Sequence, residues 1–377
     1  MVIKRIIEQE IKRLMNHGKV ISLMGARQTG KTTLIKEIAK KEKDVVWMNA
    51  DDMAVRNLLA EVSVAKFRSI IGSNRLLVVD EAQRIENIGI KMKLITDNID
   101  NVQVILTGSS SLDLSNKINE PLTGRKREFR LYPLSFGEMA AHHGVMEEIQ
   151  HLKMRLIYGA YPEVVCNPGD EKKVLMQLAD SYLYKDILEW EKIKKSDKLT
   201  KLLQALAFQV GSEVSYSEIG KFVGLDNSTV EKYITMLEQA YVIFRVGSWN
   251  RNLRNELKFA KKVYFYDNGI RNAVIQNFAD TDMRQDIGAL WENYMISELK
   301  KKIDYERGYG RIYFWRTTTN KEIDFLEEND GKITAFEFKW NSKKRGRKQN
   351  EFLNAYPNAT LETITPDNYY EYLVFMQ

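Results

Sequence analysis

The chain has 377 residues, of which 44% are hydrophobic and 29% charged, a balance that excludes a disordered chain and predicts about two to four domains. The single cysteine, Cys166, excludes an internal disulfide and a cysteine-rich zinc site, and no apolar run reaches the ~18 residues of a membrane span. A net charge of +6 and a pI of about 9.0 mildly favour a polyanionic partner. The charged N-terminus lacks the pattern of a signal peptide, so we expect a protein of the reducing cytoplasm with no membrane partner.

A phosphate-binding loop is the first motif in the chain. Residues 25–32, Gly-Ala-Arg-Gln-Thr-Gly-Lys-Thr, fit the pattern G-x-x-x-x-G-K-[ST] at every fixed position. Residues 20–24 predict a buried strand before the loop, and residues 34–39 predict a helix after it, whose N-terminus favours anionic phosphate. We expect the lysine to reach the outer phosphates of ATP and the last threonine to hold Mg²⁺. The residues expected to bind the nucleotide are Gly25, Ala26, Arg27, Gln28, Thr29, Gly30, Lys31, Thr32 and Thr33.

Two acidic residues follow a second buried strand. The apolar run from Arg75 to Val79 ends in Asp80 and Glu81, and its continuous hydrophobicity is typical of a parallel strand covered on both faces. At the carboxyl end of this strand, Asp80 would hold Mg²⁺, directly or through water, and Glu81 would activate the attacking water as a general base. We thus expect a Walker B pair of the hydrolytic type.

A third apolar run, residues 102–106, leads into a stretch of hydroxyl side chains at 107–111. Hydroxyls at this edge would sense the γ-phosphate or orient water, and we expect Ser109 to contribute. Ordinary turn chemistry is the alternative explanation for these serines.

Alternating strands and helices predict a parallel sheet with helices on both faces for residues 1–134, with the ligand at the carboxyl ends of the strands. The predicted strands are 20–24, 45–49, 76–80, 102–106 and 129–132. Helical periodicity continues over 135–195, with a clear amphipathic segment at 182–190. Within residues 135–195, the adjacent His142 and His143 indicate a helix end, because neighbouring residues on a helix do not easily face one metal.

Residues 196–254 have the pattern of a winged helix-turn-helix. Helices are predicted at 199–210, 217–224 and 226–237, followed by a wing-like strand at 242–246. The third helix begins with strong N-cap residues but offers little arginine to a DNA groove. Reading DNA and docking against protein are therefore both open as roles for this segment.

Residues 255–377 carry a second chemical pattern. A helix is predicted at 288–299, and strands at 311–316, 322–326 and 333–339, the last two joined by an Asn-Asp-Gly turn. Strand alternation places polar side chains together, and Asp324 followed by Glu337-x-Lys339 fits the D…(E/D)-x-K arrangement of restriction-endonuclease-like nucleases. Two carboxylates, Asp324 and Glu337, would hold Mg²⁺ against a phosphate, and the lysine would steady the developing charge.

Three further points bear on this pattern. Glu292, on the preceding helix, would add a carboxylate. A half-exposed hairpin without catalytic activity shows the same alternation, so the structural explanation stays open. The basic run 343–348 would either grip a nucleic-acid backbone or form a solvated loop.

Taken together, the chain resembles a widespread prokaryotic family of AAA-type ATPases with a C-terminal restriction-endonuclease-like domain of unknown function. The resemblance runs nearly end to end and is specific as a set. The motifs that carry it are residues 25–33, 76–83, 106–111, 122–125, 132–136, 158–163, 264–269, 288–293 and 314–339.

The resemblance implies further site residues. Pro162, in Gly159-Ala160-Tyr161-Pro162, is similar to the G-x-P turn of signal-transducing ATPases, whose proline touches the adenine. Arg125 stands where related ATPases have a phosphate-sensing or finger arginine, and Arg127 competes with it for that role. If either arginine acts in trans, the protein is a homo-oligomer.

We therefore expect an α/β protein with a P-loop AAA-type ATPase core (1–134), a helical lid (135–195), a winged helix (196–254) and a restriction-endonuclease-like domain (255–377). The leading hypothesis is a Mg²⁺-dependent ATPase whose nucleotide state controls a nuclease-like module acting on DNA. The alternative is an ATP-dependent regulatory switch whose C-terminal domain only binds DNA or a partner protein. A small-molecule kinase fits poorly, because phosphate-loop kinases are usually shorter and lack these added domains.

Overall fold

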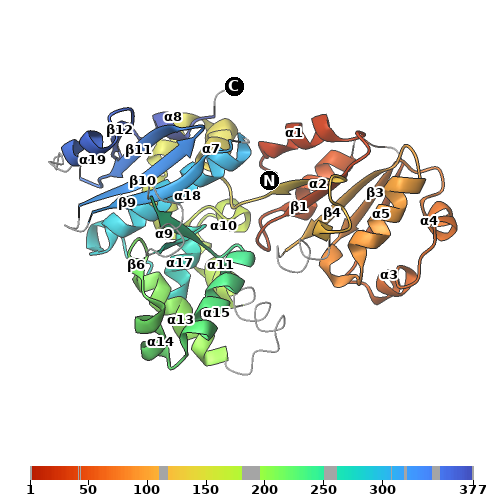
Figure 1. Ribbon diagram of the computed structural model, residues 1–377, viewed down its shortest axis with the longest axis horizontal. Helices are drawn as coiled ribbons and strands as arrows, with labels where there is room; N and C mark the ends of the chain where they lie inside the picture. Colours follow the sequence, from red (N-terminus) through yellow and green to blue (C-terminus); the bar gives the residue numbers. More distant parts are fainter. Residues whose placement is uncertain are drawn as a thin grey trace. The chain divides into compact units, whose positions relative to one another are not determined.

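A computed structural model describes most of the chain in two compact units (Figure 1). The first unit comprises residues 2–132 with 239–241, and the second comprises 133–238 with 242–377; each is described here by itself. The described residues are 2–40, 42, 44–109, 118–180, 196–249, 261–306, 308–317, 321–341 and 349–375. Among the described helices, none combines the length and apolar character that a membrane crossing requires.

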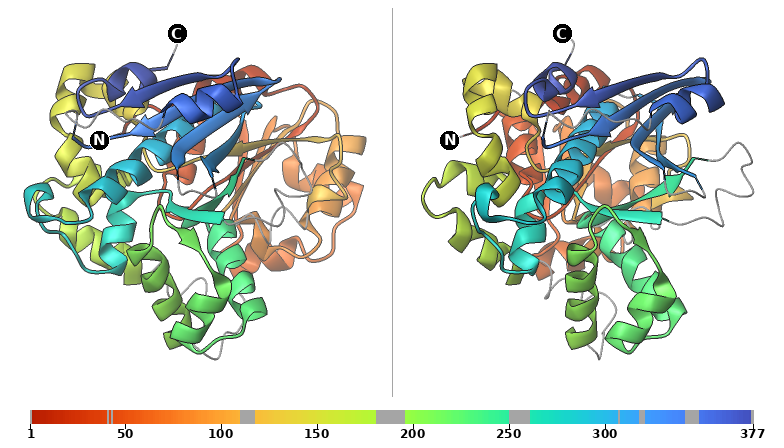
Figure 2. Two further views of the ribbon diagram at one scale, coloured as in Figure 1. Left: turned by 60° about the vertical axis from the view of Figure 1, so that its left-hand side comes forward. Right: turned by 90° about the vertical axis from the view of Figure 1, so that its left-hand side faces the viewer.

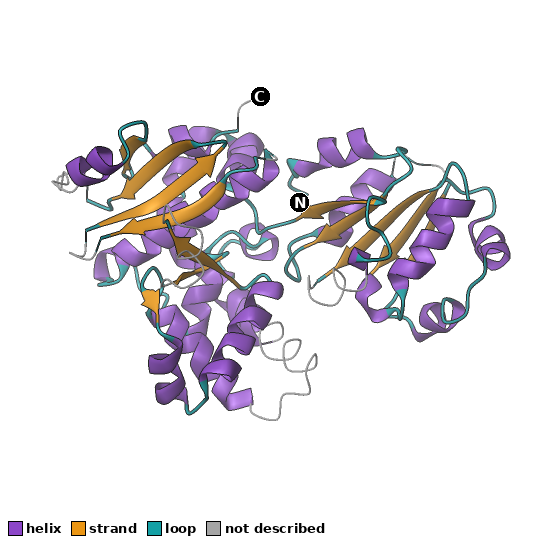
Figure 3. Ribbon diagram, in the orientation of Figure 1, coloured by secondary structure: helices purple, strands orange, loops and turns teal. Residues whose placement is uncertain are grey.

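The first unit is built on a parallel sheet with strand order β2-β3-β4-β1-β5, drawn in orange in Figure 3. Its strands are β1 (Val20–Met24), β2 (Val45–Asn49), β3 (Leu76–Asp80), β4 (Gln103–Gly108) and β5 (Lys126–Arg130). The central strands β1, β3 and β4 are buried along their whole length, as their continuous apolar runs predict. The last strand begins three residues earlier than predicted, because β5 is an edge strand whose first residues are charged and half-buried.

Helices connect these strands. They are α1 (Ile7–Leu14), α2 (Lys31–Ala39), α3 (Met53–Leu58), α4 (Val64–Ile71) and α5 (Ile88–Asn98), with a 3-10 turn η1 (Ala82–Arg84) after β3. The predicted helix after the phosphate loop is confirmed as α2, which starts directly at Lys31. The strand, loop and helix therefore follow one another as the motif requires.

The second unit begins with five short helices, α7 (Phe136–His143), α8 (Val145–Gln150), α9 (Leu152–Tyr158), α10 (Pro162–Cys166) and α11 (Glu171–Leu178). A capping box starts α7, in which Ser135 and Glu138 each accept a hydrogen bond from the other's backbone N–H. The helix ends at His143, so the interpretation of the two histidines as a helix end is confirmed. The amphipathic segment predicted at 182–190 lies outside the described residues.

A compact group of three helices follows, seen in green in both views of Figure 2. The order along the chain is α13 (Ser196–Phe208), β6 (Glu213–Val214), α14 (Tyr216–Val223), α15 (Asn227–Gln239), β7 (Ile243–Ser248) and β8 (Lys261–Phe265). β8 pairs antiparallel with both β6 and β7, so a three-stranded patch lies beside the three helices.

The C-terminal elements extend this patch into a seven-stranded sheet with the order β12-β11-β10-β9-β7-β8-β6. They are α17 (Asn268–Val274), η3 (Thr281–Met283), α18 (Ile287–Tyr305), β9 (Arg311–Arg316), β10 (Glu322–Asn329), β11 (Lys332–Phe338), α19 (Gln349–Ala355), β12 (Thr360–Ile364) and α20 (Tyr369–Leu373). β7 joins β9 in parallel through Gly247 and Tyr313. The sheet thus continues across the expected boundary at 254/255, and the domain boundaries themselves stay predictions.

Two local features of the C-terminal hairpin position the second site. The predicted turn is confirmed, since Asp330 and Gly331 both have positive φ, at 51° and 83°. In β10 the pairing with β9 shifts between Ile323, opposite Trp315, and Leu326, opposite Tyr313, so β10 contains one additional residue. The regular alternation of side chains is therefore interrupted after Asp324, where Phe325 and Leu326 are buried in succession.

Candidate functional site

The phosphate loop of the first unit is closely packed against the chain after β5. A Cβ atom at Gly25 would lie 2.1 Å from the Leu131 carbonyl oxygen, so only glycine fits there. Gly30 has φ +94°, and Gln28 is also left-handed at 59°. These conformations let the loop curl back on itself, and the Thr29 hydroxyl donates to the Ala26 carbonyl at 2.8 Å.

Lys31 is buried inside this loop, with 5% of its surface exposed. Its ammonium donates to the Gly25 and Ala26 carbonyls at 2.9 and 2.7 Å. Burial lowers the pKa of Lys31 to about 8, and the neighbouring Arg27 adds to this effect, whereas Glu81 and Asp80 oppose it. The lysine is thus held where a phosphate would replace the loop carbonyls as its partner.

Asp80 is held by two hydroxyl groups at the carboxyl edge of the sheet. Thr32 donates to Asp80 Oδ2 at 3.0 Å, and Thr107 donates to Oδ1. The carboxylate and the Thr32 hydroxyl are the oxygen donors that Mg²⁺ prefers, and they come from the loop and the adjacent strand. These residues therefore fit a Mg²⁺-nucleotide.

Glu81 lies beside this pair in a constrained position. Its backbone is left-handed, with φ 53°, which is uncommon for a residue other than glycine or asparagine. Its carboxylate accepts hydrogen bonds from Gln83 Nε2 at 2.5 Å and from Ser109 at 3.2 Å. Ser109 thus contacts the expected general base, while Ser110 and Ser111 lie outside the described residues. Backbone strain of this kind, at a residue expected to act as a general base, is often found at functional sites.

The sequence did not reveal Arg5 as part of this site. Arg5 is 6% exposed and donates to the Thr29 and Tyr132 carbonyls, each at 2.6 Å. It links the phosphate loop to the end of the unit. No motif marks it, because its two partners are 24 and 127 residues away.

The structure does not bring Arg125 to the phosphate loop of its own chain. The carbonyl of Arg125 accepts from Val20, at the start of β1, whereas the loop follows the other end of that strand. The Arg125 side chain pairs with Asp97 at 2.7 Å. Arg127, the competing residue, is paired in register with Ile21 near the same edge.

Pro162 belongs to the second unit. It is the first residue of α10, and the preceding Gly159 and Ala160 pack against the buried carboxylate of Asp267. Asp267 accepts from the Ala160 N–H at 2.7 Å and from the Ile270 N–H at 3.0 Å. The turn is therefore rigid, and its contact with adenine stays a prediction.

The second unit gathers three carboxylates of its own. Single oxygen atoms of Glu292, Glu322 and Asp324 lie within 4.8 Å of one another. Glu292 comes from α18, which is fastened to β8 by Asn293: its side chain accepts from the Phe265 N–H at 2.7 Å and donates to the Phe265 carbonyl at 3.1 Å. Such a group offers several oxygen ligands to a divalent cation.

Glu337 and Lys339 form a separate pair. Their side chains are 2.6 Å apart, and Glu337 is 1% exposed, with one carboxylate oxygen that no described residue contacts. Glu337 lies opposite Asp324 in the β10–β11 register, but it is not among the three carboxylates whose oxygens lie within 4.8 Å of one another. The hydrogen bond to Glu337, and then the charges of Asp324 and Glu292, raise the pKa of Lys339 against the effect of burial. The catalytic roles of both residues stay predictions.

The electrostatics of the three-carboxylate group are unusual. Burial, and then the nearby Glu292 carboxylate, raise the pKa of Asp324 to about 7, although the Phe338 N–H bonds to it at 2.8 Å. A carboxylic acid that titrates near neutrality inside a group of like charges is a candidate functional residue.

Sequence analysis did not propose three residues at this site: Glu322, which belongs to the three-carboxylate group, and Lys262 and Tyr264, which contact it. Lys262 and Tyr264 alternate on β8, and both contact Glu292 Oε1, at 3.2 and 2.6 Å. Glu322 stands two residues before Asp324, so alternation alone would have found it. Lys262 follows Lys261 directly, before the apolar run that starts at Val263, so no signal in the sequence distinguished it from its neighbour.

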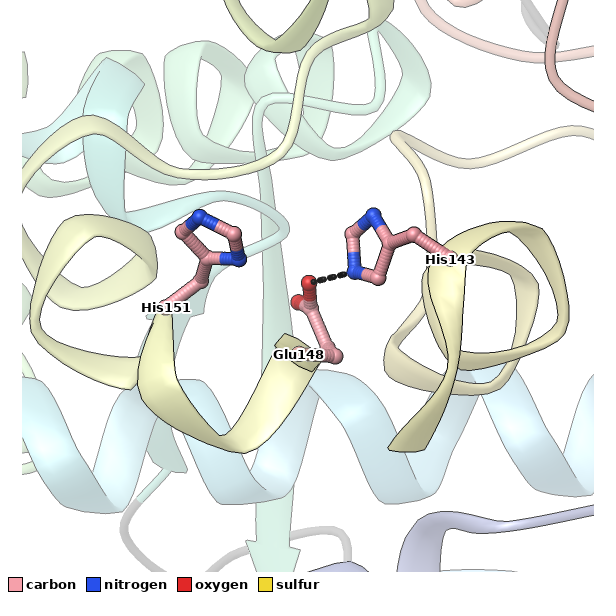
Figure 4. Close-up of side chains that lie close together, drawn as sticks. All are labelled: His143, Glu148 and His151. Atoms are coloured by element: carbon pink, nitrogen blue, oxygen red, sulfur yellow. Dashed lines mark hydrogen bonds and ion pairs between the residues drawn. The ribbon is translucent and has the colours of Figure 1, made fainter. Parts of the chain in front are cut away.

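A third cluster, of His143, Glu148 and His151, lies where α7, α8 and α9 meet (Figure 4). Both imidazoles lie beside the Glu148 carboxylate, and His143 Nε2 is 3.0 Å from it. Arg155 donates to both oxygens of Glu148, at 2.7 and 2.8 Å. Because a guanidinium already neutralises the buried glutamate, we interpret this cluster as a structural ion pair rather than a metal site.

Three protein families match successive parts of the chain. Residues 17–140 match the family described as AAA domain. Residues 149–281 and 287–369 match two families described as Domain of unknown function, DUF8612 and DUF4143. Residues 17–140 are therefore similar to an AAA-type ATPase domain, a class of domain whose ligand is in general a nucleotide with a divalent metal.

Comparison with whole proteins extends the likeness over most of the chain. An uncharacterised protein of Mycobacterium tuberculosis is 22% identical over 333 residues, covering 87% of this chain and 72% of that protein. An uncharacterised protein of Methanocaldococcus jannaschii is 26% identical over 339 residues, covering 84% and 73%. The Walker-type ATPase of Pyrococcus abyssi is 15% identical with a TM-score of 0.50, covering 73% of this chain and 96% of that structure, which shows a shared fold.

The lowered pKa of Lys31 predicts that ATP binding weakens in alkaline solution. In the free protein the ammonium loses its proton as the pH rises through about 8, whereas bound phosphates favour the charged form. Above that pH, binding must take up a proton, so we expect the Kd to rise by up to about tenfold per pH unit. Calorimetric titration with a non-hydrolysable ATP analogue between pH 7 and 9.5 measures this. Lys31→Met should bind weakly with a flat profile, and a flat wild-type profile would contradict the prediction.

The Glu148–Arg155 pair predicts a large loss of stability when only one partner is removed. Arg155→Met leaves a buried carboxylate without its guanidinium, so we expect a loss of about 3–5 kcal/mol in the second unit. Arg311→Met is the matched control, since Arg311 is exposed and its pair with Glu328 at 3.7 Å should be worth about 0–1 kcal/mol.

Hydrogen exchange of α9 and α18 against a urea series measures both variants. Adding Glu148→Gln to Arg155→Met should recover part of the loss. Equal effects of Arg155→Met and Arg311→Met would show that Glu148 does not depend on its arginine.

Proposed function

We propose that the protein hydrolyses ATP and that its nucleotide state controls a nuclease-like module in the second unit, acting on DNA. One observation supports this function above others: a single chain holds two separate carboxylate sites suited to phosphate chemistry. Asp80 lies beside the phosphate loop, and Asp324 lies beside Glu292 and Glu322. A protein that only bound ATP would not need the second group.

ATP hydrolysis is assigned to residues of the first unit. Lys31 exchanges its loop carbonyls for the outer phosphates, and Thr32 with Asp80 holds the metal. When bound, Mg²⁺ neutralises charge on the phosphate oxygens. Glu81 accepts the proton of the attacking water, while Gln83 and Ser109 orient its carboxylate.

Arg125 acts, in this proposal, on the nucleotide of a second copy of the chain. Its position at the opposite edge of its own sheet leaves the phosphate loop of the same chain without it. A finger arginine supplied in trans stabilises charge on the transferred phosphoryl group. The active form would then be a homo-oligomer.

The second unit supplies the nucleic-acid-acting part. Helices α13, α14 and α15 with the β7–β8 hairpin have the order of elements of a winged helix, which supports DNA binding or docking by this segment. Asp324 and Glu292 would hold a divalent cation against a phosphodiester, and Lys339 would stabilise the developing negative charge. The basic run 343–348 lies outside the described residues.

Coupling between the two parts is supported by how the second unit is built. Among the helices from 136 to 178, α9 and α11 contact α17 and α9 also contacts α18, and all of them belong to one compact unit with the C-terminal sheet. A displacement of the helical lid on hydrolysis would therefore carry the nuclease-like group with it. We infer that the unit responds to nucleotide as one body.

Two substitutions separate the activities. Lys31→Ala should lower ATP turnover by about 10²-fold or more, because the γ-phosphate loses its charge partner. Asp324→Asn should abolish DNA cleavage with ATP turnover retained. Plasmid and single-stranded DNA, incubated with ATP and Mg²⁺ or Mn²⁺, measure cleavage, and phosphate release measures turnover.

The controls are Lys36→Ala, on the same helix as Lys31, and Glu328→Gln, on the same strand as Asp324. Cleavage that is lost in Lys31→Ala as well would establish control by nucleotide. ATP turnover without cleavage of any DNA form would reject the nuclease function in favour of a regulatory switch that only binds DNA or a partner protein. Such a switch should turn over ATP slowly and be indifferent to free DNA.

A further inference from the structure

Lys262 is the only described cation that contacts two members of the three-carboxylate group. Its ammonium lies 3.2 Å from Glu292 Oε1, hydrogen-bonds to Glu322, and stands 5.3 Å from the centre of the Phe314 ring. The side chain is 2% exposed, on β8 in the interior of the seven-stranded sheet. Burial disfavours the charged lysine, but Glu292 and Glu322 outweigh this and raise its pKa.

Glu292 is fixed in place on this side. Tyr264 donates to the same oxygen as Lys262, at 2.6 Å. Gly211, with φ +77°, approaches the carboxylate so closely that a Cβ there would lie 3.2 Å from Oε1. With these three residues around it, the Oε1 side of Glu292 is filled by the protein itself.

The remaining oxygens of the group differ in their protein partners. Asp324 Oδ2 accepts from Phe338, and Glu322 Oε2 is 3.8 Å from Arg316. Among the described residues, no hydrogen bond reaches Asp324 Oδ1 or Glu292 Oε2. These two oxygens are available to one cation, whereas the positions beside Glu322 Oε1 and Glu292 Oε1 are taken by the ammonium.

We propose that Lys262 is the resident cation of this group, and that it restricts the site to a single divalent cation held by Asp324 and Glu292. The inference rests on the proposed function of that site and deepens it. Three carboxylates are balanced by one ammonium and one divalent cation. A second divalent cation, about 4 Å from the first as in two-metal nucleases, would have to share Glu292 and Glu322 with a buried ammonium that repels it.

At a site with one cation, protein groups or water must supply the stabilisation of the leaving oxygen that a second cation would otherwise give. A cation bound by Asp324 and Glu292 would supply polarisation of the phosphate, and the leaving oxygen would take its proton from water or a side chain. Lys262 is then a positioning residue that keeps Glu292 and Glu322 in place.

The test is a count of Mn²⁺ bound per full-length chain by equilibrium dialysis without nucleotide, in an Asp80→Asn background that removes the phosphate-loop site. We expect one Mn²⁺, lost in Asp324→Asn. Lys262→Met, which keeps the length of the side chain but not its charge, should bind two, or bind one at least about tenfold more tightly. Lys261→Met, the neighbour on the same strand, should leave the count and affinity unchanged.

Two outcomes would overturn the inference: two Mn²⁺ on the Lys262-containing protein, or a folded Lys262→Met protein with unchanged count and affinity. The first does not depend on a variant that folds. If two Mn²⁺ bind and DNA is still cleaved, the proposed function survives and only the role of Lys262 fails. If no Mn²⁺ binding depends on Asp324 and no DNA is cleaved, the nuclease function fails with it.

Discussion

Both carboxylate sites depend on one electrostatic constraint: acidic side chains held close together and partly out of water need a compensating charge from the protein. Two like charges 4 Å apart repel by about 4 kcal/mol at an effective dielectric constant of 20. Asp80 and Glu81 have the buried Lys31 beside them, and hydroxyl groups hold Asp80. Glu292 and Glu322 have the buried Lys262. Each ammonium lowers the cost of keeping carboxylates ready for phosphate chemistry.

The two sheets meet this constraint in different ways. In the first unit, parallel strands end at one edge, so Asp80 and Thr107 arrive side by side from β3 and β4. In the second unit, the group is assembled from β8, β10 and α18, which lie far apart in the chain. The position of Asp80 beside Thr107 follows from the order of the parallel strands. The three-carboxylate group forms only if the side chains of α18 and β10 point toward one another. This difference explains why the sites were unequally visible in the sequence.

Prediction from sequence succeeded where the residues that define a feature follow one another directly in the chain. The phosphate loop, the strand ending at Asp80 and the Asp330-Gly331 turn lie where they were predicted. It missed Arg5 and Lys262, since their partners lie far along the chain. The expected grouping of Asp324 with Glu337 stays a prediction. The register that pairs Phe325 with Phe336 runs without a shift, so it sets Asp324 opposite Glu337 on the neighbouring strand.

The sequence by itself determined the phosphate-binding loop motif at residues 25–32, because its glycines, lysine and hydroxyl lie in a single short stretch of backbone. Only the tertiary structure decided which carboxylates share a site in the second unit and which cation accompanies them. Lys262 is 30 residues from Glu292 and 60 from Glu322, so their contact exists only after β8, β10 and α18 have packed together. The physical reason is that a buried charge is stabilised by its neighbours in space, and sequence spacing does not encode those neighbours.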